Sequence, residues 1–155
     1  MKRTKPLHLP MSIIGENSPV FHFSYEGVLP PYRENRKERI QVRDRYLMKT
    51  LETYNWSEIN NQFERAAIYV AYYFASNRKR DLDNRNRKYL LDALRRTLLI
   101  KDDCWQHVSW MEEGFRDIRE HTEVFVMDRG VFSDFLNRWD TYGLKLLIGG
   151  MNSGK

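Results

Sequence analysis

The amino-acid sequence predicts an α+β protein with a small mixed sheet of about four strands and helices packed on it. Three observations lead to this fold class. Aromatic residues alternate along 20–29, which is typical of a strand with one buried face. The segment 65–75 is β-branched and aromatic, which indicates a buried strand. A helix is indicated over about 84–98, because one face of it carries Leu90, Leu91, Leu94 and Leu98.

The first part of the chain is expected to run from an extended lead-in into a strand and a helix. Prolines disfavour a helix in residues 1–18. The strand 20–29 is ended by Pro30-Pro31, which cannot continue a strand ladder. A helix is then predicted over about 36–55. Its expected buried stripe consists of Ile40, Tyr46, Leu47 and Leu51.

The second half of the chain is expected to add two strands and a last helix. The segments 104–114 and 121–128 are predicted to form an antiparallel pair joined through 114–120. A C-terminal helix over 131–143 ends near Gly143, a residue type that favours helix ends. The predicted order is strand, helix, strand, helix, strand, strand, helix.

Composition limits the class of protein but not its function. The 155 residues suggest one domain, and 41% hydrophobic with 30% charged residues is ordinary for a folded protein. The net charge of +5 is compatible with nucleic acid, acidic lipid or acidic protein partners. It does not choose among them.

Cysteine content and hydropathy predict a soluble, cytoplasmic protein. The single cysteine, Cys104, excludes an internal disulfide framework and a multi-cysteine zinc site. The longest apolar run, 66–75, is about half of the roughly 20 residues that a membrane helix needs. No membrane association is therefore expected.

The segment RKRDLDNRNRK (78–88) places two aspartates within a run of basic residues, and nine Lys/Arg stand against three Asp over 78–101. In an extended segment Asp81 and Asp83 share a face. The helix and turn that follow lead to Asp102-Asp103, so both acidic pairs could converge. Carboxylates without His or Cys favour Mg²⁺ or Mn²⁺. The alternative is that these aspartates are helix caps, turn residues or surface charges.

The segment RDLDNRNRKYLLDALRRTLLIKDD (80–103) resembles the signature of the RusA-type Holliday junction resolvases. The family pattern is Asp-x-Asp-Asn, a lysine, an Asp-Ala-Leu segment and a paired acidic turn. It is matched in order by Asp81, Asp83, Asn84, Lys88, Asp92-Ala93-Leu94 and Asp102-Asp103. The resemblance implies a RusA-like nuclease domain over 19–128. Residues 1–18 would be a lead-in and 129–155 a helical extension with a flexible tail.

The resemblance further implies a homodimeric, Mg²⁺-dependent endonuclease that resolves four-way DNA junctions by paired nicks. Asp81, Asp83 and Asp103 would bind the metal, while Asp102 either assists or only shapes the turn. Lys88 would contact the phosphate or stabilise developing charge. The family usually has two residues between the Asp-x-Asp-Asn and the lysine, but here there are three. Arg87 is therefore a rival for the role of Lys88.

The basic residues around these acids are predicted to hold the DNA backbone, with affinity that falls steeply with salt. They are Arg78, Lys79, Arg80, Arg85, Arg87, Arg95 and Arg96. Two alternatives stay open. The chain could be a non-catalytic branched-DNA-binding accessory or regulatory protein on the same fold, or a nuclease for other branched structures such as flaps.

Three other signals are weaker. GGMNSGK (149–155) has the spacing of a phosphate-binding loop, but the sequence given holds neither the Ser/Thr that would bind magnesium nor a following helix, so no nucleotide cofactor is expected. His107 is expected to be structural rather than catalytic. Cys104 has no identifiable activating base, so half-buried packing is the preferred interpretation.

Overall fold

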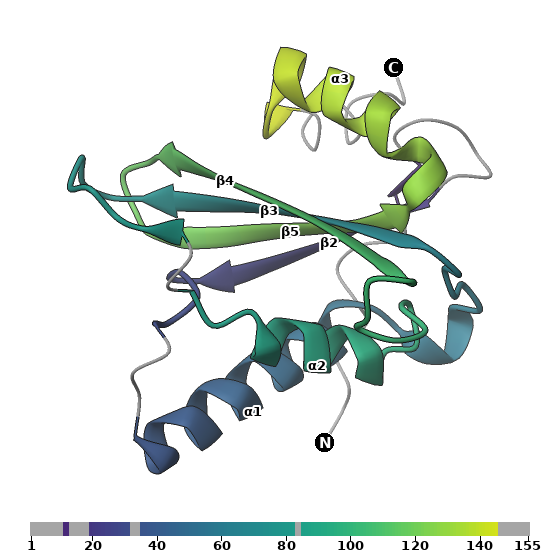
Figure 1. Ribbon diagram of the computed structural model, residues 1–155, viewed down its shortest axis with the longest axis horizontal. Coiled ribbons are helices and arrows are strands. Elements are labelled where there is room, and N and C mark those ends of the chain that lie inside the picture. The colour runs from purple at the N-terminus through teal and green to yellow at the C-terminus, as the bar shows by residue number, and fades with distance from the viewer. Residues whose placement is uncertain (1–10, 13–18, 32–34, 83–84, 146–155) are drawn as a thin grey trace.

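The computed structural model describes residues 11–12, 19–31, 35–82 and 85–145. Within these residues a mixed sheet is packed between helices, which confirms the predicted α+β class (Figure 1). The strands are β1 (Met11–Ser12), β2 (Pro19–Glu26), β3 (Ala66–Phe74), β4 (Val108–Arg116) and β5 (His121–Asp128). The helices are α1 (Arg36–Thr53), α2 (Lys88–Arg96) and α3 (Phe132–Tyr142). No helix in the described ranges is both long and apolar enough to span a membrane.

The sheet has the strand order β1-β2-β5-β3-β4. Strand β5 pairs antiparallel with both β2 and β3, and β3 pairs parallel with β4. The predicted antiparallel pair of 104–114 with 121–128 is therefore wrong, because β3 lies between these two strands. Strand β3 is buried at nearly every position on both faces, so burial favours a central place with a neighbour on each side.

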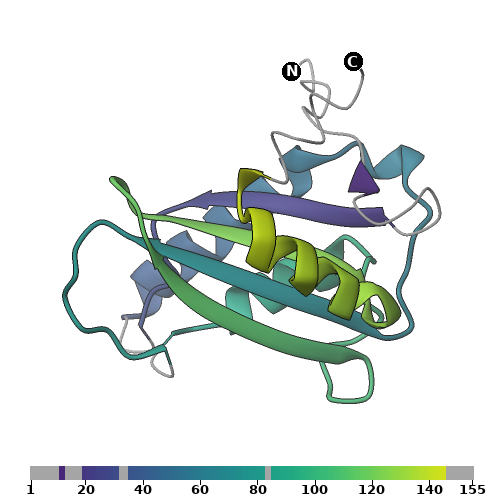
Figure 2. The same ribbon diagram turned by 90° about the horizontal axis from the view of Figure 1, so that it is seen from above.

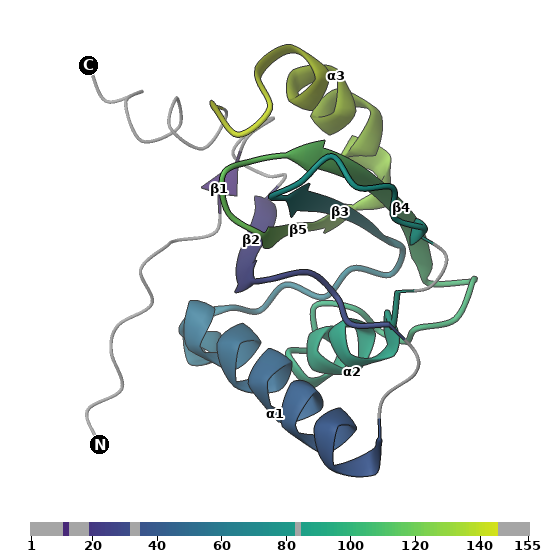
Figure 3. The same cartoon turned by 90° about the vertical axis from the view of Figure 1, so that its left-hand side faces the viewer.

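The sheet separates two hydrophobic clusters, and Figure 3 shows the resulting layers. Alternate residues of β3 belong to different clusters because successive side chains of a strand point to opposite faces. Ile68 and Val70 face the side covered by α1 and α2, whereas Tyr69 faces α3. Helix α3 lies across the sheet (Figure 2) and contributes Phe135 and Trp139, whose rings lie 5.6 and 5.3 Å from that of Tyr69.

Helix α1 lies where it was predicted, but its buried face was predicted only in part. Asn35 and Glu38 form a reciprocal capping box at its first turn. The predicted buried stripe was partly wrong, since Ile40 and Leu51 are 39% and 40% exposed. The helix buries Tyr46, as predicted, and also Thr50 one turn later, whose hydroxyl is hydrogen-bonded to that of Tyr25 at 2.6 Å. A buried polar pair therefore sets the orientation of α1.

Helix α2 begins at Lys88, four residues later than the expected start near 84. The residues just before it are engaged elsewhere: Arg85 forms an isolated bridge with Pro31, and the Asn86 N–H donates to the Pro30 carbonyl at 2.8 Å. These contacts keep 85–87 in a turn. The three residues between Asn84 and Lys88, one more than in the pattern that the sequence resembles, thus come before the helix.

Candidate nucleic-acid interface at the end of strand β3

A basic pocket lies beyond the C-terminal end of β3. Its volume is about 270 Å³, and it is lined by Pro31, Arg78, Lys79, Arg80, Asp81 and Arg85. Four cationic side chains therefore surround one carboxylate. The two flanks of the predicted DNA-contacting segment meet here because Arg85 is brought back against Pro31. Such a concentration of positive charge is suited to a phosphate group.

The ring of Phe74, the last residue of β3, supports two of these arginines. The Arg80 guanidinium carbon lies 4.7 Å and that of Arg85 5.9 Å from the ring centroid. Arg80 is further held by the Ser76 hydroxyl at 3.0 Å and by Glu120 at 2.9 Å. Arg85 donates to the Leu29 carbonyl at 3.1 Å. Both guanidinium groups are therefore held in place before any ligand binds.

The other two cations are exposed at the edge of the pocket. Among the residues that the structure describes, the side chains of Arg78 and Lys79 have no hydrogen-bond or ion-pair partner. No acidic side chain in the described ranges therefore neutralises their charges. They are the pocket residues most available to an anion from solution.

Asp81 is exposed at the same pocket, next to Leu82, which packs against the core. The side chains of these two neighbours therefore point in opposite directions. Asp83 and Asn84 lie outside the described residues. Of the predicted metal ligands, Asp81 is thus the one that the described structure places in the basic pocket.

Arg87 points away from solvent and binds Glu112 of β4. Its Nε lies 3.1 Å from both carboxylate oxygens, its Nη2 makes a further short contact with Oε1, and Nη2 also donates to the Leu82 carbonyl at 3.1 Å. The Tyr72 hydroxyl and the Trp110 indole N–H donate to Glu112 Oε2 at 3.0 and 3.2 Å. Glu112 is therefore the centre of a partly buried polar cluster that links Arg87 to β4 and β3, and Arg87 in turn holds the Leu82 carbonyl.

The ionisation of Glu112 is consistent with this role. Burial acts to raise the pKa of the Glu112 carboxyl, but hydrogen bonds from Arg87, Trp110 and Tyr72 outweigh it, and the pKa is lowered. Lys88 differs from Arg87, because its side chain is exposed and its ammonium contacts no other group in the described structure. Lys88 is thus the residue of the two that is available to a ligand.

Asp102 and Asp103 lie at the opposite end of α2 from Asp81. The nine residues of α2 span about 13 Å. Because β3 and β4 are parallel, the connection through α2 takes the chain back to the end of the sheet where both strands begin (Figure 1). There Arg95 Nε lies 3.8 Å from Asp102 and its Nη1 3.7 Å from Asp103. The Asp103 N–H also holds the pKa of Asp102 below its ordinary value. Within one chain, Asp81 therefore does not lie beside Asp102 or Asp103.

The same separation applies to other predicted positions. Arg95 and Arg96 are at the end of α2 that lies away from the basic pocket. Arg96 lines a larger groove of about 890 Å³, bounded by the ends of α1 and α2, whose charged lining residues are only Arg96 and Glu52. Its charge is balanced, so it does not match an anion site. In the described part of the chain, no group of three His, Cys, Asp or Glu side chains could hold a metal ion.

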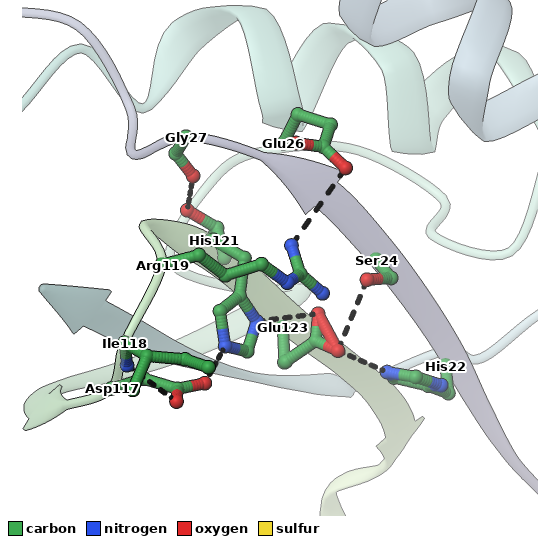
Figure 4. A network of polar contacts seen from close by, with 10 residues as sticks. His22, Ser24, Glu26, Gly27, Asp117, Ile118, Arg119, His121 and Glu123 are labelled. Atoms are coloured by element: carbon green, nitrogen blue, oxygen red, sulfur yellow. Dashed lines mark hydrogen bonds and ion pairs between the residues drawn. The ribbon is translucent and has the colours of Figure 1, made fainter. Parts of the chain in front are cut away.

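A second polar cluster, absent from the sequence prediction, lies on the α3 side of the sheet (Figure 4). Glu123 of β5 accepts a hydrogen bond from the Ser24 hydroxyl at 3.0 Å and lies 3.5 Å from His22 Nε2 and 3.7 Å from His121 Nδ1. His121 Nε2 in turn donates to Asp117 at 2.7 Å. The available signal was the polar i, i+2 alternation in both strands, opposite their apolar faces.

Comparison of the chain with protein-family models and with curated proteins found no match.

Proposed function

We propose that the protein is a metal-dependent, structure-selective endodeoxyribonuclease of the RusA type, which binds four-way DNA junctions and cuts them by paired nicks. The observation that carries this proposal is Asp81 in a pocket of four cations, within the segment that resembles the family signature. We further propose a cytoplasmic setting, in recombination, repair or phage DNA processing.

The backbone phosphates would bind at the basic pocket. Arg80 and Arg85 are already held on Phe74, so they would lose little conformational freedom on binding a phosphate. Arg78 and Lys79 would release counterions from the DNA. Lys88, exposed at the first turn of α2, would reach a phosphate next to the scissile one.

Magnesium or manganese would be held by Asp81 with its sequence neighbour Asp83. When bound, such an ion neutralises phosphate charge and activates water. The fit is incomplete within one chain, because Asp103 lies beyond the far end of α2. We propose a homodimer, since two symmetric nicks need two sites. Asp103 could join the Asp81 site only from a second copy of the chain.

The test is cleavage of a labelled immobile four-way junction beside a linear duplex of the same sequence, with Mg²⁺, Mn²⁺ or EDTA. Paired symmetric nicks that require metal and occur only in the junction are expected. Tight junction binding without cutting under any metal would overturn the nuclease assignment.

That second outcome corresponds to an alternative function, a non-catalytic branched-DNA-binding accessory or regulatory protein. The separation of Asp81 from Asp102 and Asp103 favours it, because the Arg95 contacts give the second acidic pair a structural role. Titration with Mn²⁺ separates the two functions. Saturable binding that is lost in an Asp81→Asn, Asp83→Asn variant supports the nuclease, and no response supports the binding protein.

A further inference from the structure

The connection between β4 and β5 presents an isolated apolar side chain at its outermost point. Residues 117–120 pass over the C-terminal end of β3 because β4 and β5 are not neighbours in the sheet. Ile118 within this connection is 95% exposed, the highest value of any large hydrophobic residue described. The connection lies at the C-terminal end of β3, the end beyond which the basic pocket is found (Figure 1).

The protein holds this connection firmly. The Ile118 N–H donates to Asp117 Oδ1 at 2.7 Å, and the second oxygen of Asp117 accepts from His121 at 2.7 Å. The Asp117 N–H donates to the Phe74 carbonyl, and the Gly27 N–H to the Glu120 carbonyl, both at 3.0 Å. The connection is thus tied to the ends of β3 and β2 as well as to its own strands.

The buried cluster in Figure 4 lies directly beneath it. His121 and Glu123 are buried, and His121 Nδ1, Glu123 Oε2 and His22 Nε2 have no hydrogen-bond partner among the described residues. Burying such groups opposes folding unless they are paired. These groups nevertheless form a series of polar contacts that runs from His22 of β2 through Glu123 and His121 to Asp117. Asp117 also accepts the Ile118 N–H, so these contacts reach the backbone of Ile118.

Cations flank the exposed isoleucine. Arg116, two positions before it, and Arg119, one position after it, are both exposed, and Arg119 lies 3.7 Å from the carboxylate of Glu26, whose side chain is 90% exposed. Glu120 also links the connection to the pocket through its 2.9 Å ion pair with Arg80. DNA whose backbone occupied the basic pocket would therefore lie beside Ile118.

From these contacts we infer that Ile118 is an apolar wedge, which enters the base stack of branched DNA where the stack is interrupted. Single exposed apolar residues are common on protein surfaces. Ile118 differs because hydrogen bonds hold the backbone of its connection, and because this connection carries arginines and is linked to the basic pocket. Proteins that unstack base steps likewise combine an inserted apolar side chain with basic residues. The inference rests on the proposed function, because it needs branched DNA as the ligand.

The experiment compares Ile118→Ala with the wild-type protein on a four-way junction that carries 2-aminopurine at the branch point. The wild type is expected to raise the fluorescence, because unstacking relieves quenching, and the variant is expected to leave it near the level of free DNA. Junction affinity should fall by roughly tenfold, the effect of losing one buried aliphatic side chain. Since Ile118 is exposed, the variant should fold normally.

Trp105→Ala is the matched control. Trp105 is 82% exposed but precedes β4, at the other end of that strand, so its variant should behave as wild type. An unchanged fluorescence rise with Ile118→Ala would overturn the wedge, as would a wild type that gives no rise. Metal-dependent cleavage by the wild type, measured on the same junction, tests the nuclease separately. An Ile118-dependent rise without cleavage would support the wedge on a binding protein.

Discussion

Gly114 of β4 lies directly against the ring of Phe74 of β3, where an added Cβ would be only 3.1 Å from Phe74 Cε2. The absence of a side chain at Gly114 therefore gives Phe74 the space to support Arg80 and Arg85. A glycine on the edge strand β4 thus helps to set the geometry of the basic pocket.

Gly114→Ala is expected to displace the Phe74 ring, because the contact is tighter than packed carbon atoms normally allow. Overpacking of this kind costs about 1–3 kcal/mol. The melting temperature should fall and junction binding should weaken. Adding Phe74→Leu should restore most of the stability but not the binding, since leucine leaves room and offers no π face to Arg80. If the two substitutions acted independently on stability, the proposed contact would be wrong.

Arg87→Ala and Lys88→Ala should have different effects, the first on stability and the second on junction cleavage. Loss of Arg87 leaves the 12% exposed Glu112 carboxylate without its main partner, so the free energy of unfolding should fall by about 2–3 kcal/mol. Lys88→Ala should leave stability unchanged and reduce junction cleavage. Urea unfolding and cleavage rates would measure both. The reverse pattern would assign the phosphate contact to Arg87.

Asp81→Asn is expected to reduce metal-dependent cleavage by roughly a hundredfold or more, because it removes a charged ligand oxygen. Junction binding should stay equal or become tighter, since a negative charge leaves the pocket. The comparison variant is Asp102→Asn, which changes a carboxylate at the other end of α2. Equal losses in both variants would indicate that the two acidic pairs act together, as a dimeric site would require.

The salt dependence of junction binding should distinguish the two groups of predicted DNA-binding residues. Each lost phosphate contact reduces the slope of log affinity against log salt by about 0.9. Arg78→Ala and Lys79→Ala should each produce a change of this size, because these cations line the pocket. Arg95→Ala should not, since Arg95 is paired with Asp102 and Asp103. An equal effect at Arg95 would extend the interface along α2.

Glu123 should make stability depend on pH in the acid range. Burial acts to raise its pKa, but contacts with His22 and Ser24 outweigh burial and hold the pKa below its ordinary value of 4.5. A lowered pKa in the folded state stabilises the protein above the unfolded value, and this contribution is lost as pH falls through the folded value. Glu123→Gln should therefore lower the melting temperature at pH 7.

The difference between wild type and Glu123→Gln should shrink as the pH falls below the ordinary pKa of glutamate and through the lowered pKa of folded Glu123, because the wild-type carboxyl then becomes neutral as well. Melting curves at pH 7, 5 and 3 would measure it. Ser24→Ala, which removes one hydrogen bond to the same carboxylate, should cause a smaller change in the same direction. A difference that stays constant with pH would exclude a charged Glu123 as the cause.

Local patterns were sufficient to predict most elements. The aromatic alternation in β2, the continuous apolar run of β3 and the leucine spacing of α2 each express the period of one kind of structure, so their type could be predicted from neighbouring residues. The predicted leucine face was wrong at Leu98, which lies beyond α2 and is 64% exposed. The order RKRDLDNRNRK likewise predicted that acids and bases would be adjacent. The pocket that contains Asp81 and Arg78 agrees with that prediction.

The tertiary structure decided which strands and side chains are neighbours. Strand β3 lies between β4 and β5, where both of its apolar faces are covered, and the parallel crossover from β3 to β4 takes Asp102 and Asp103 to the other end of the sheet from Asp81. Arg87 could be distinguished from Lys88 only once Glu112 of β4 was placed beside it. The network under Ile118 joins residues 22 and 123, about a hundred positions apart. Sequence periodicity reports which face of an element is buried, whereas pairing between distant elements depends on how those faces pack together.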